Sequence, residues 1–195
     1  MYFGRILAGF VGFIIFIVIL VALFGHGGKK PATPVNALKP LGDYAQTDAT
    51  VSFTADGIVN ADELHRAIRI TVSANQMELD VTQGYNPQVI QSKTFVNNQE
   101  AYTVFLKAIA NSGFVAKNKK SRAPADPAGQ CPLGFRFILN LNQDGDDLSN
   151  LWASSCGTAA GNSSGAITTI QTLFQDQIPN YQTLIGQVNL SATTE

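Results

Sequence analysis

The most specific chemistry in this chain belongs to its two cysteines, Cys131 and Cys156. An even pair of cysteines is typical of one disulfide in an oxidising compartment, and the alternative is two free thiols. If residues 142–145 form a four-residue hairpin loop, the flanking strands pair so that Cys131 lies opposite Cys156, within disulfide range. Neither cysteine has a nearby histidine or a CxxC spacing, so the pattern favours a structural disulfide over a catalytic thiol.

An acidic stretch, residues 140–147, lies between the cysteines and offers several oxygen ligands. Oxygen-bearing side chains at alternate positions, followed by Gly145, are typical of the start of a calcium-binding loop. However, Leu151 stands where such a loop needs a bidentate glutamate, and strands rather than helices are expected on both sides. We therefore interpret the stretch as a polar hairpin turn, with Asp144 and Asp146 as the candidate ligands if calcium binds weakly.

A cluster of cations lies in the expected loop 115–130 and is the candidate contact for an anionic surface, either lipid headgroups or an anionic wall polymer. No aromatic residues alternate with the charges, which favours a solvated surface loop over this binding role. The cluster consists of Lys117, Lys119, Lys120 and Arg122.

Other catalytic or nucleic-acid-binding patterns find little support. The two histidines are His26, in a linker, and His65, which we expect to be exposed at the start of a strand. The chain has no GxSxG, HExxH, P-loop or dinucleotide fingerprint, and a pair of carboxylates acting as acid and base stays an alternative. A formal net charge of −1 gives no reason to expect a nucleic-acid partner.

The N-terminal part of the chain predicts a membrane anchor. Ile6–Phe24 runs for nineteen residues without a charged residue, long enough to cross the lipid bilayer once as a helix. A cleaved signal peptide is the alternative, but its apolar core is usually shorter. Gly4, Ala8 and Gly12 form a small-residue seam through which two such helices could pair as a homodimer.

The orientation of this anchor is not decided by its own flanks. Arg5 and the terminal amine on one side balance Lys29 and Lys30 on the other. The expected disulfide breaks the tie, because disulfides persist in oxidising compartments. We therefore expect a single-pass protein whose C-terminal domain lies outside the cytoplasm.

The rest of the chain divides by composition. Residues 1–24 are the expected signal-anchor helix, and residues 25–47, which are rich in proline and glycine, are the expected linker. Residues 48–190 are the expected folded domain, and residues 191–195 a disordered tail. About 150 residues suffice for one domain with its own core.

Two helices are expected in this domain. Apolar residues spaced by three and four predict a helix over 99–111, capped by Asn98 and ended by Gly113. The same spacing runs through 165–188, where Pro179 should kink the helix or split it into two.

Strands are predicted where apolar and polar residues alternate. In the clearest hairpin, Arg69 on one strand can pair with Glu78 or Asp80 on the other. The expected strands are 49–54, 66–73 paired with 76–83, a weak strand at 92–96, and 135–141 paired with 148–156.

These expectations describe an α+β protein in which a single transmembrane helix precedes a small antiparallel sheet, with two helices packed on one face in a twice-repeated hairpin–helix order. The function favoured by this organisation is a non-catalytic interaction or assembly module of the cell surface or envelope, with a protein or envelope partner and no cofactor. A hydrolase using carboxylates and a calcium-stabilised adhesion domain are the alternatives.

Overall fold

The computed structural model describes residues 38–157 and 161–191 of the chain. The expected membrane segment Ile6–Phe24, its small-residue seam and the linker up to residue 37 lie outside the described residues. Within the described part, no helix is both long and apolar enough to cross a membrane. The described residues belong to a single unit that begins at Leu38.

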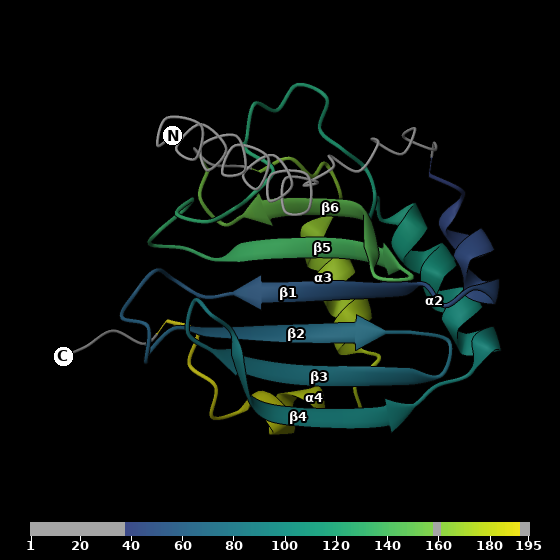
Figure 1. Ribbon diagram of the computed structural model, residues 1–195, viewed down its shortest axis with the longest axis horizontal. Helices are drawn as coiled ribbons and strands as arrows, with labels where there is room; N and C mark the ends of the chain where they lie inside the picture. Colours follow the sequence, from purple (N-terminus) through teal and green to yellow (C-terminus); the bar gives the residue numbers. More distant parts are fainter. Residues whose placement is uncertain (1–37, 158–160, 192–195) are drawn as a thin grey trace, which may run out of the picture. The chain divides into compact units, whose positions relative to one another are not determined.

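A six-stranded antiparallel sheet forms the frame of this unit, with the strand order β4-β3-β2-β1-β5-β6 (Figure 1). β1 lies between β2 and β5, so the two predicted hairpins are joined through a strand that precedes both of them in the chain. The strands are β1 (Thr50–Asp56), β2 (Arg66–Val72), β3 (Gln76–Gln83), β4 (Gln88–Val96), β5 (Arg136–Gln143) and β6 (Asp146–Ser154).

The described helices leave one face of the sheet uncovered. In Figure 1, α3 and α4 lie behind the sheet, and α2 lies at its end beside the 3-10 helix η1. Antiparallel sheet and helices together confirm the expected α+β class. The helical elements are η1 (Leu41–Gln46), α2 (Gln99–Asn111), α3 (Ile167–Gln175) and α4 (Tyr181–Ile185).

Strand alternation divides the side chains between two environments. On β1, Val51 and Phe53 are buried in the core on the helix side, where Phe53 packs against Phe174 of α3. Thr54 and Asp56, at the alternate positions of β1, point to the opposite side, which we call the open face. The open face matters for function because polar side chains there are not needed for the core.

Several local predictions are confirmed. The helix α2 has the expected bounds, the Asn98 side chain accepts a hydrogen bond from the Ala101 amide at 3.0 Å, and Gly113 adopts a φ of +78° after its end. The last helical segment is split at Pro179 into α3 and α4.

The folded unit starts earlier than the composition indicates. Leu41, Tyr44 and Ala45 lie within the stretch read as linker, yet η1 buries all three, and Ala45 accepts a hydrogen bond from Gln99 of α2 at 3.2 Å. The prolines of this stretch led to its interpretation as a linker. A proline immediately before a helix, however, does not prevent the helix from forming.

The register of the second hairpin differs from the prediction. The turn contains two residues, Asp144 and Gly145, with φ of 55° and 85°, instead of the four residues expected, and Leu141 pairs with Ser149. Positive φ at both central residues is the geometry that suits the twist of a hairpin, and the register then shifts by one residue after Leu141. The prediction of a four-residue loop at 142–145, and of the strand register that such a loop sets, is therefore wrong.

The disulfide predicted from that register forms nonetheless. Cys131 and Cys156 are bonded, with their Cα atoms 5.6 Å apart. Cys131 lies outside the β5–β6 ladder, in a turn in which Gly134 donates a backbone hydrogen bond to Cys131. This turn, and not an extension of the strands, brings the two cysteines together, so the prediction of the bond is confirmed and the reason given for it is wrong.

Candidate functional site

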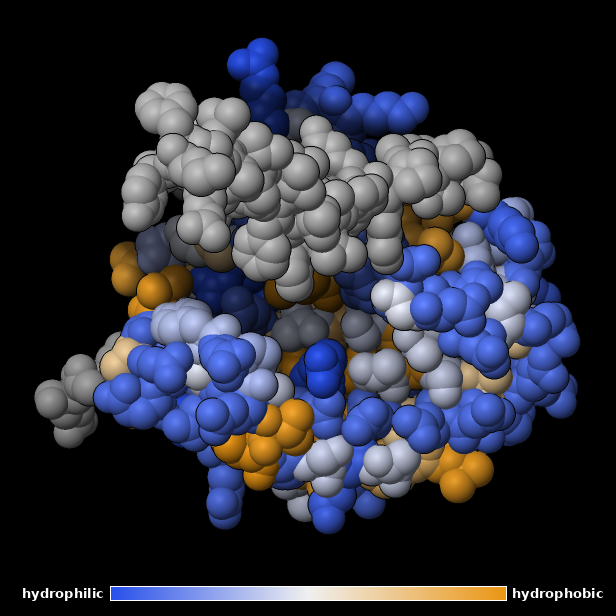
Figure 2. Space-filling view, in the orientation of Figure 1, coloured by the Kyte–Doolittle hydropathy of each residue, from blue (hydrophilic) through white to orange (hydrophobic). Residues whose placement is uncertain are grey.

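A pocket of about 320 Å³ opens on the open face, within the size range of small-ligand sites. Figure 2 shows this face hollowed near its middle, with mainly hydrophilic residues along the lower edge of the hollow. One wall of the pocket is formed by the loop 126–129. The opposite wall is formed by Val59, His65, Gly84, Tyr85 and Pro87.

The floor of the pocket is set by the register of four strands. Thr54 of β1 lies between Arg69 of β2 and Ile138 of β5. One step along the strands, Asp56 lies between Ala67 and Arg136, and Thr82 of β3 lies beyond Ala67. Side chains at paired positions share a face, so the ladder places all of these groups together.

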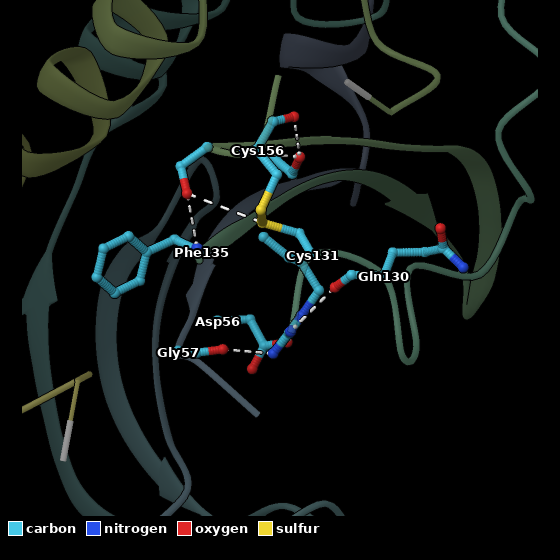
Figure 3. Close-up of a disulfide and its surroundings, with 9 residues drawn as sticks. Asp56, Gly57, Gln130, Cys131, Phe135 and Cys156 are labelled. Carbon is cyan, nitrogen blue, oxygen red and sulfur yellow. Dashed lines mark hydrogen bonds and ion pairs between the residues drawn. A yellow bond between two sulfur atoms is a disulfide. The ribbon is translucent and has the colours of Figure 1, made fainter. Parts of the chain in front are cut away.

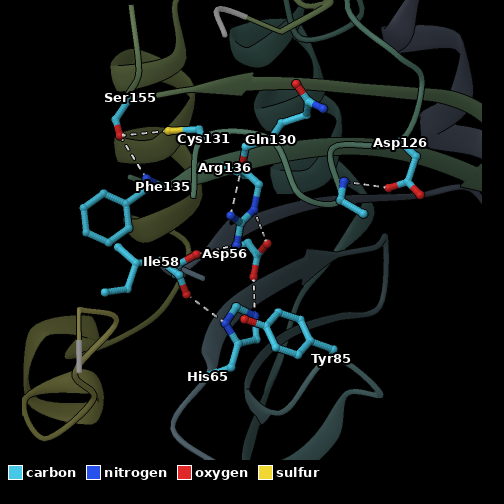
Figure 4. Close-up of polar contacts among 12 residues, drawn as sticks. Asp56, Ile58, His65, Tyr85, Asp126, Gln130, Cys131, Phe135, Arg136 and Ser155 are labelled. Carbon is cyan, nitrogen blue, oxygen red and sulfur yellow. Dashed lines mark hydrogen bonds and ion pairs between the residues drawn. The ribbon is translucent and has the colours of Figure 1, made fainter. Parts of the chain in front are cut away.

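Asp56 is the centre of a polar network at the base of the pocket (Figure 4). Its Oδ1 lies 2.8 Å from Nε2 of His65, and its Oδ2 accepts a hydrogen bond from Nε of Arg136 at 2.6 Å. The side chains of His65 and Arg136 are only 5% and 2% exposed, so the buried Arg136 depends on this carboxylate for its counter-charge and His65 depends on it for a hydrogen-bond partner.

The Arg136 guanidinium is held on three sides. Besides Asp56, it donates to the backbone carbonyl of Gln130 at 3.2 Å and to the carbonyl of Gly57. Figure 3 shows Asp56 and Gly57 below the disulfide and Gln130 to the right of Cys131, which it precedes in the chain. The disulfide thus anchors the segment that supplies one of the acceptors for Arg136.

His65 is fixed by stacking as well as by hydrogen bonds. Its ring stacks on that of Tyr85, with centroids 4.3 Å apart and an interplanar angle of 16°. The Tyr85 hydroxyl accepts a hydrogen bond from the Asn60 amide and donates to the Asn60 carbonyl, each at 2.9 Å. Tyr85 follows Gly84, whose φ of +80° turns the chain after β3 and brings the ring over His65.

The geometry of His65 limits the chemistry that it can perform. Nδ1 lies 3.1 Å from the carbonyl oxygen of Ile58, and Nε2 faces Asp56, so both ring nitrogens point at oxygen acceptors. A general base needs a nitrogen within reach of its substrate, and His65 has neither nitrogen free.

Among the described residues that line the pocket, Arg69 is the cation that is not enclosed. Its side chain is 45% exposed, and it donates one hydrogen bond, of 2.8 Å, to Oδ2 of Asp80. Asp80 itself is buried, and its Oδ1 has no hydrogen-bond partner among the described residues. The predicted cross-strand pairing of Arg69 is therefore confirmed with Asp80.

The wall formed by residues 126–129 is held in place by the loop before it. Nε1 of the buried Trp152 donates to the Pro124 carbonyl at 2.8 Å, which ties this loop to β6. Asp126 accepts a hydrogen bond from the Ala128 amide at 2.9 Å, so its carboxylate stabilises the turn. These contacts make the loop a fixed wall of the pocket.

The proposed calcium ligands lie away from this pocket. Asp144 and Asp146 are exposed at the β5–β6 turn. In the described part of the chain, no three His, Cys, Asp or Glu side chains gather closely enough to hold a metal ion. Hydrogen bonds from Asn142 and Asn140 lower the pKa of the neighbouring Asp147. Calcium binding at Asp144 and Asp146 stays a prediction.

The cation cluster is also separate from the pocket. Lys117, Lys119, Lys120 and Arg122 are all exposed on the loop after α2, and none of them lines the pocket. The loop itself is anchored, because Lys117 forms a backbone bridge with Ser163. Contact of this cluster with an anionic surface likewise stays a prediction.

Sequence reasoning missed the centre of the site. His65 is 4% exposed, so the expectation of an exposed histidine is wrong. It is buried because Tyr85 covers its ring and Asp56 and Ile58 satisfy its nitrogens. The sequence does place two oppositely charged residues, Asp56 and Arg136, at the ends of predicted strands, which could have indicated an ion pair. Only the pairing of β1 with β5, however, brings these two residues together.

A scan against models of known protein families finds no match, and a search of curated proteins finds no similar sequence. The functional argument therefore rests on the geometry of the pocket.

Proposed function

We propose that this chain is a membrane-anchored recognition module, whose outer domain binds a partner at the open-face pocket without catalysing a reaction. The apolar run Ile6–Phe24 supports the anchor. The disulfide between Cys131 and Cys156 supports an oxidising location for the domain, outside the cytoplasm.

The observation that carries the non-catalytic assignment is that the groups of the Asp56 network bond to one another within the protein. Both carboxylate oxygens of Asp56 and both ring nitrogens of His65 have partners within the protein. A hydrolase using carboxylates needs a carboxyl group that acts on a water molecule or a leaving group, whereas the Asp56 carboxylate is engaged by Arg136 and His65. In this network the groups hold one another and the walls of the pocket, which is what a rigid recognition site requires.

The lining of the pocket favours binding. Ala67, Ile138 and Val59 supply apolar surface, and Arg69 supplies one accessible charge. Sites that recognise a ligand typically combine apolar walls with a few fixed polar groups. The partner would therefore insert an apolar group into the pocket and be oriented by Arg69.

Site-specific photo-crosslinking of the full-length chain in intact cells tests this proposal. A benzoylphenylalanine in place of Val59, at the rim of the pocket, should give a discrete crosslinked product. The same substitution at Val104, which is exposed on α2 and outside this pocket, is the control position and should not give that product.

A pocket-filling variant makes the test specific. Ala67→Phe should abolish the Val59 product because the ring occupies the middle of the floor. Thr71→Phe, on the same strand and the same face but outside the pocket lining, should leave it unchanged. Persistence of the product in Ala67→Phe, or an equal product from Val104, would overturn the proposal.

A further inference from the structure

Arg69 has the features of a ligand-binding group in this pocket. Its only hydrogen bond among the described residues is the 2.8 Å contact from Nη2 to Asp80, so Nε, Nη1 and the second N–H of Nη2 keep their donors available. Because the side chain is 45% exposed and lines the pocket, a ligand can reach these donors. Asp80, at 5% side-chain exposure, holds the guanidinium from behind.

The other pocket cation cannot play this role. Arg136 is 2% exposed, and its guanidinium already donates to Asp56, Gln130 and Gly57. An incoming anion would have to displace those contacts. Arg69 is therefore the group through which the pocket can recognise a negative charge.

We infer that the ligand group received by this pocket carries a single carboxylate, which pairs with the free edge of Arg69, and an apolar body that lies over Ala67 and Ile138. A guanidinium presents donors in a planar fork that matches the two oxygens of a carboxylate. On the floor of the pocket, Ala67 is two residues before Arg69 on β2, on the same face, and Ile138 lies on β5 beyond Thr54. This inference rests on the proposed recognition role and specifies its ligand class.

The charges around the pocket favour one negative charge over two. Asp56 and Asp126 line the pocket, and Asp80 is paired with Arg69 just behind it. A dianionic phosphate would meet repulsion from these carboxylates, whereas a monoanion needs only the one available guanidinium. A neutral amide isostere would lose the charge-assisted part of the contact.

The test uses the detergent-solubilised full-length chain and three probes of similar shape: benzoate, benzamide and phenyl phosphate. Saturation-transfer NMR titrations should show benzoate binding most tightly. The double variant Arg69→Gln/Asp80→Asn removes both charges of the pair, so that no buried carboxylate is left unpaired. It should weaken benzoate binding by about tenfold or more, and leave benzamide binding unchanged.

The matched control is Arg66→Gln, which changes an arginine on the same strand that does not line this pocket. It should bind benzoate as the wild type does. The fluorescence of Trp152, the only tryptophan of the chain, should show that each variant is folded.

Three results would overturn the inference: unchanged benzoate affinity in the double variant, equal affinity of the wild type for benzamide, or tighter binding of phenyl phosphate than of benzoate. If benzoate fails to bind while the Val59 crosslink forms and is lost in Ala67→Phe, the ligand class is wrong and the recognition site stands. If benzoate binds through Arg69 but no crosslink forms, the inferred carboxylate site is supported, and the proposal that a macromolecular partner binds at this pocket is wrong.

Discussion

Nε2 of His65 lies 2.8 Å from Oδ1 of Asp56, nine residues earlier in the chain, and this contact joins the start of β2 to the end of β1. The same carboxylate holds Arg136, which lies 80 residues later on β5. One side chain therefore fixes the relative positions of three neighbouring strand ends and the base of the pocket.

Loss of the Asp56 carboxylate should be strongly destabilising. Asp56→Ala leaves the guanidinium of Arg136 buried without its counter-charge, for which we expect a loss of about 3–5 kcal/mol in the free energy of unfolding. Urea unfolding followed by Trp152 fluorescence measures this change. Asp126→Ala, which removes an exposed carboxylate from the same pocket, is the control and should cost less than about 1 kcal/mol. Equal effects of the two substitutions would contradict the central role of Asp56.

The disulfide should account for a large part of the stability of the domain. The bond joins residues separated by 25 positions, and closing such a loop is worth about 3–4 kcal/mol on the chain-entropy model. The double variant Cys131→Ser/Cys156→Ser should lower the urea midpoint accordingly. In the wild type, alkylation without a reductant should label neither thiol, and labelling of both in freshly isolated membranes would argue against an oxidising location.

The stability of the domain should fall at alkaline pH because of Tyr102. Burial raises the pKa of this phenol above its ordinary value of 10.0, so the folded state favours the neutral form. Below pH 10, the contribution of Tyr102 to the free energy of unfolding is fully present. It is lost as the pH rises from 10 toward the pKa of Tyr102 in the folded state, because the unfolded chain releases the proton first.

The variant Tyr102→Phe tests this assignment. At neutral pH it should cost about 1 kcal/mol, because the hydroxyl donates to the Ala49 carbonyl at 2.9 Å. Above pH 10 the variant should lose less stability than the wild type does. Parallel pH profiles for the two proteins, from urea titrations at fixed ionic strength, would point to another group.

The orientation of the chain can be measured directly. In intact cells, added protease should cut the full-length chain beyond about residue 30, because the proposal places the domain outside the cytoplasm. Cleavage only after the membrane is permeabilised would mean the opposite orientation. An internal cytoplasmic marker protein should survive the protease in the same sample.

Local interactions were predictable from the sequence. The bounds of α2, its Asn98 cap, the hairpin of β2 with β3 and the split at Pro179 depend on residues within a few positions of one another. Capping, strand alternation and the missing amide of proline act over such distances, so they can be read before the fold is known. The disulfide was predictable from the cysteine count, although the pairing register used to support it was not correct.

The site depended on contacts between distant parts of the chain. Arg136 meets Asp56 because β1 pairs with β5 as well as with β2, and no local pattern specifies which strands become neighbours. Burial of His65 depends on Tyr85, which reaches it only through the turn after β3.

By itself, the sequence determined an apolar segment long enough to span a membrane, an α+β domain and one disulfide. The tertiary structure decided that a hydrogen-bonded network of Asp56, His65 and Arg136 supports a pocket in which Arg69 is the accessible cation among the described residues. The physical reason is that propensity and periodicity act along the chain, whereas the register of the sheet selects which distant side chains share a face and which of them remain in contact with solvent.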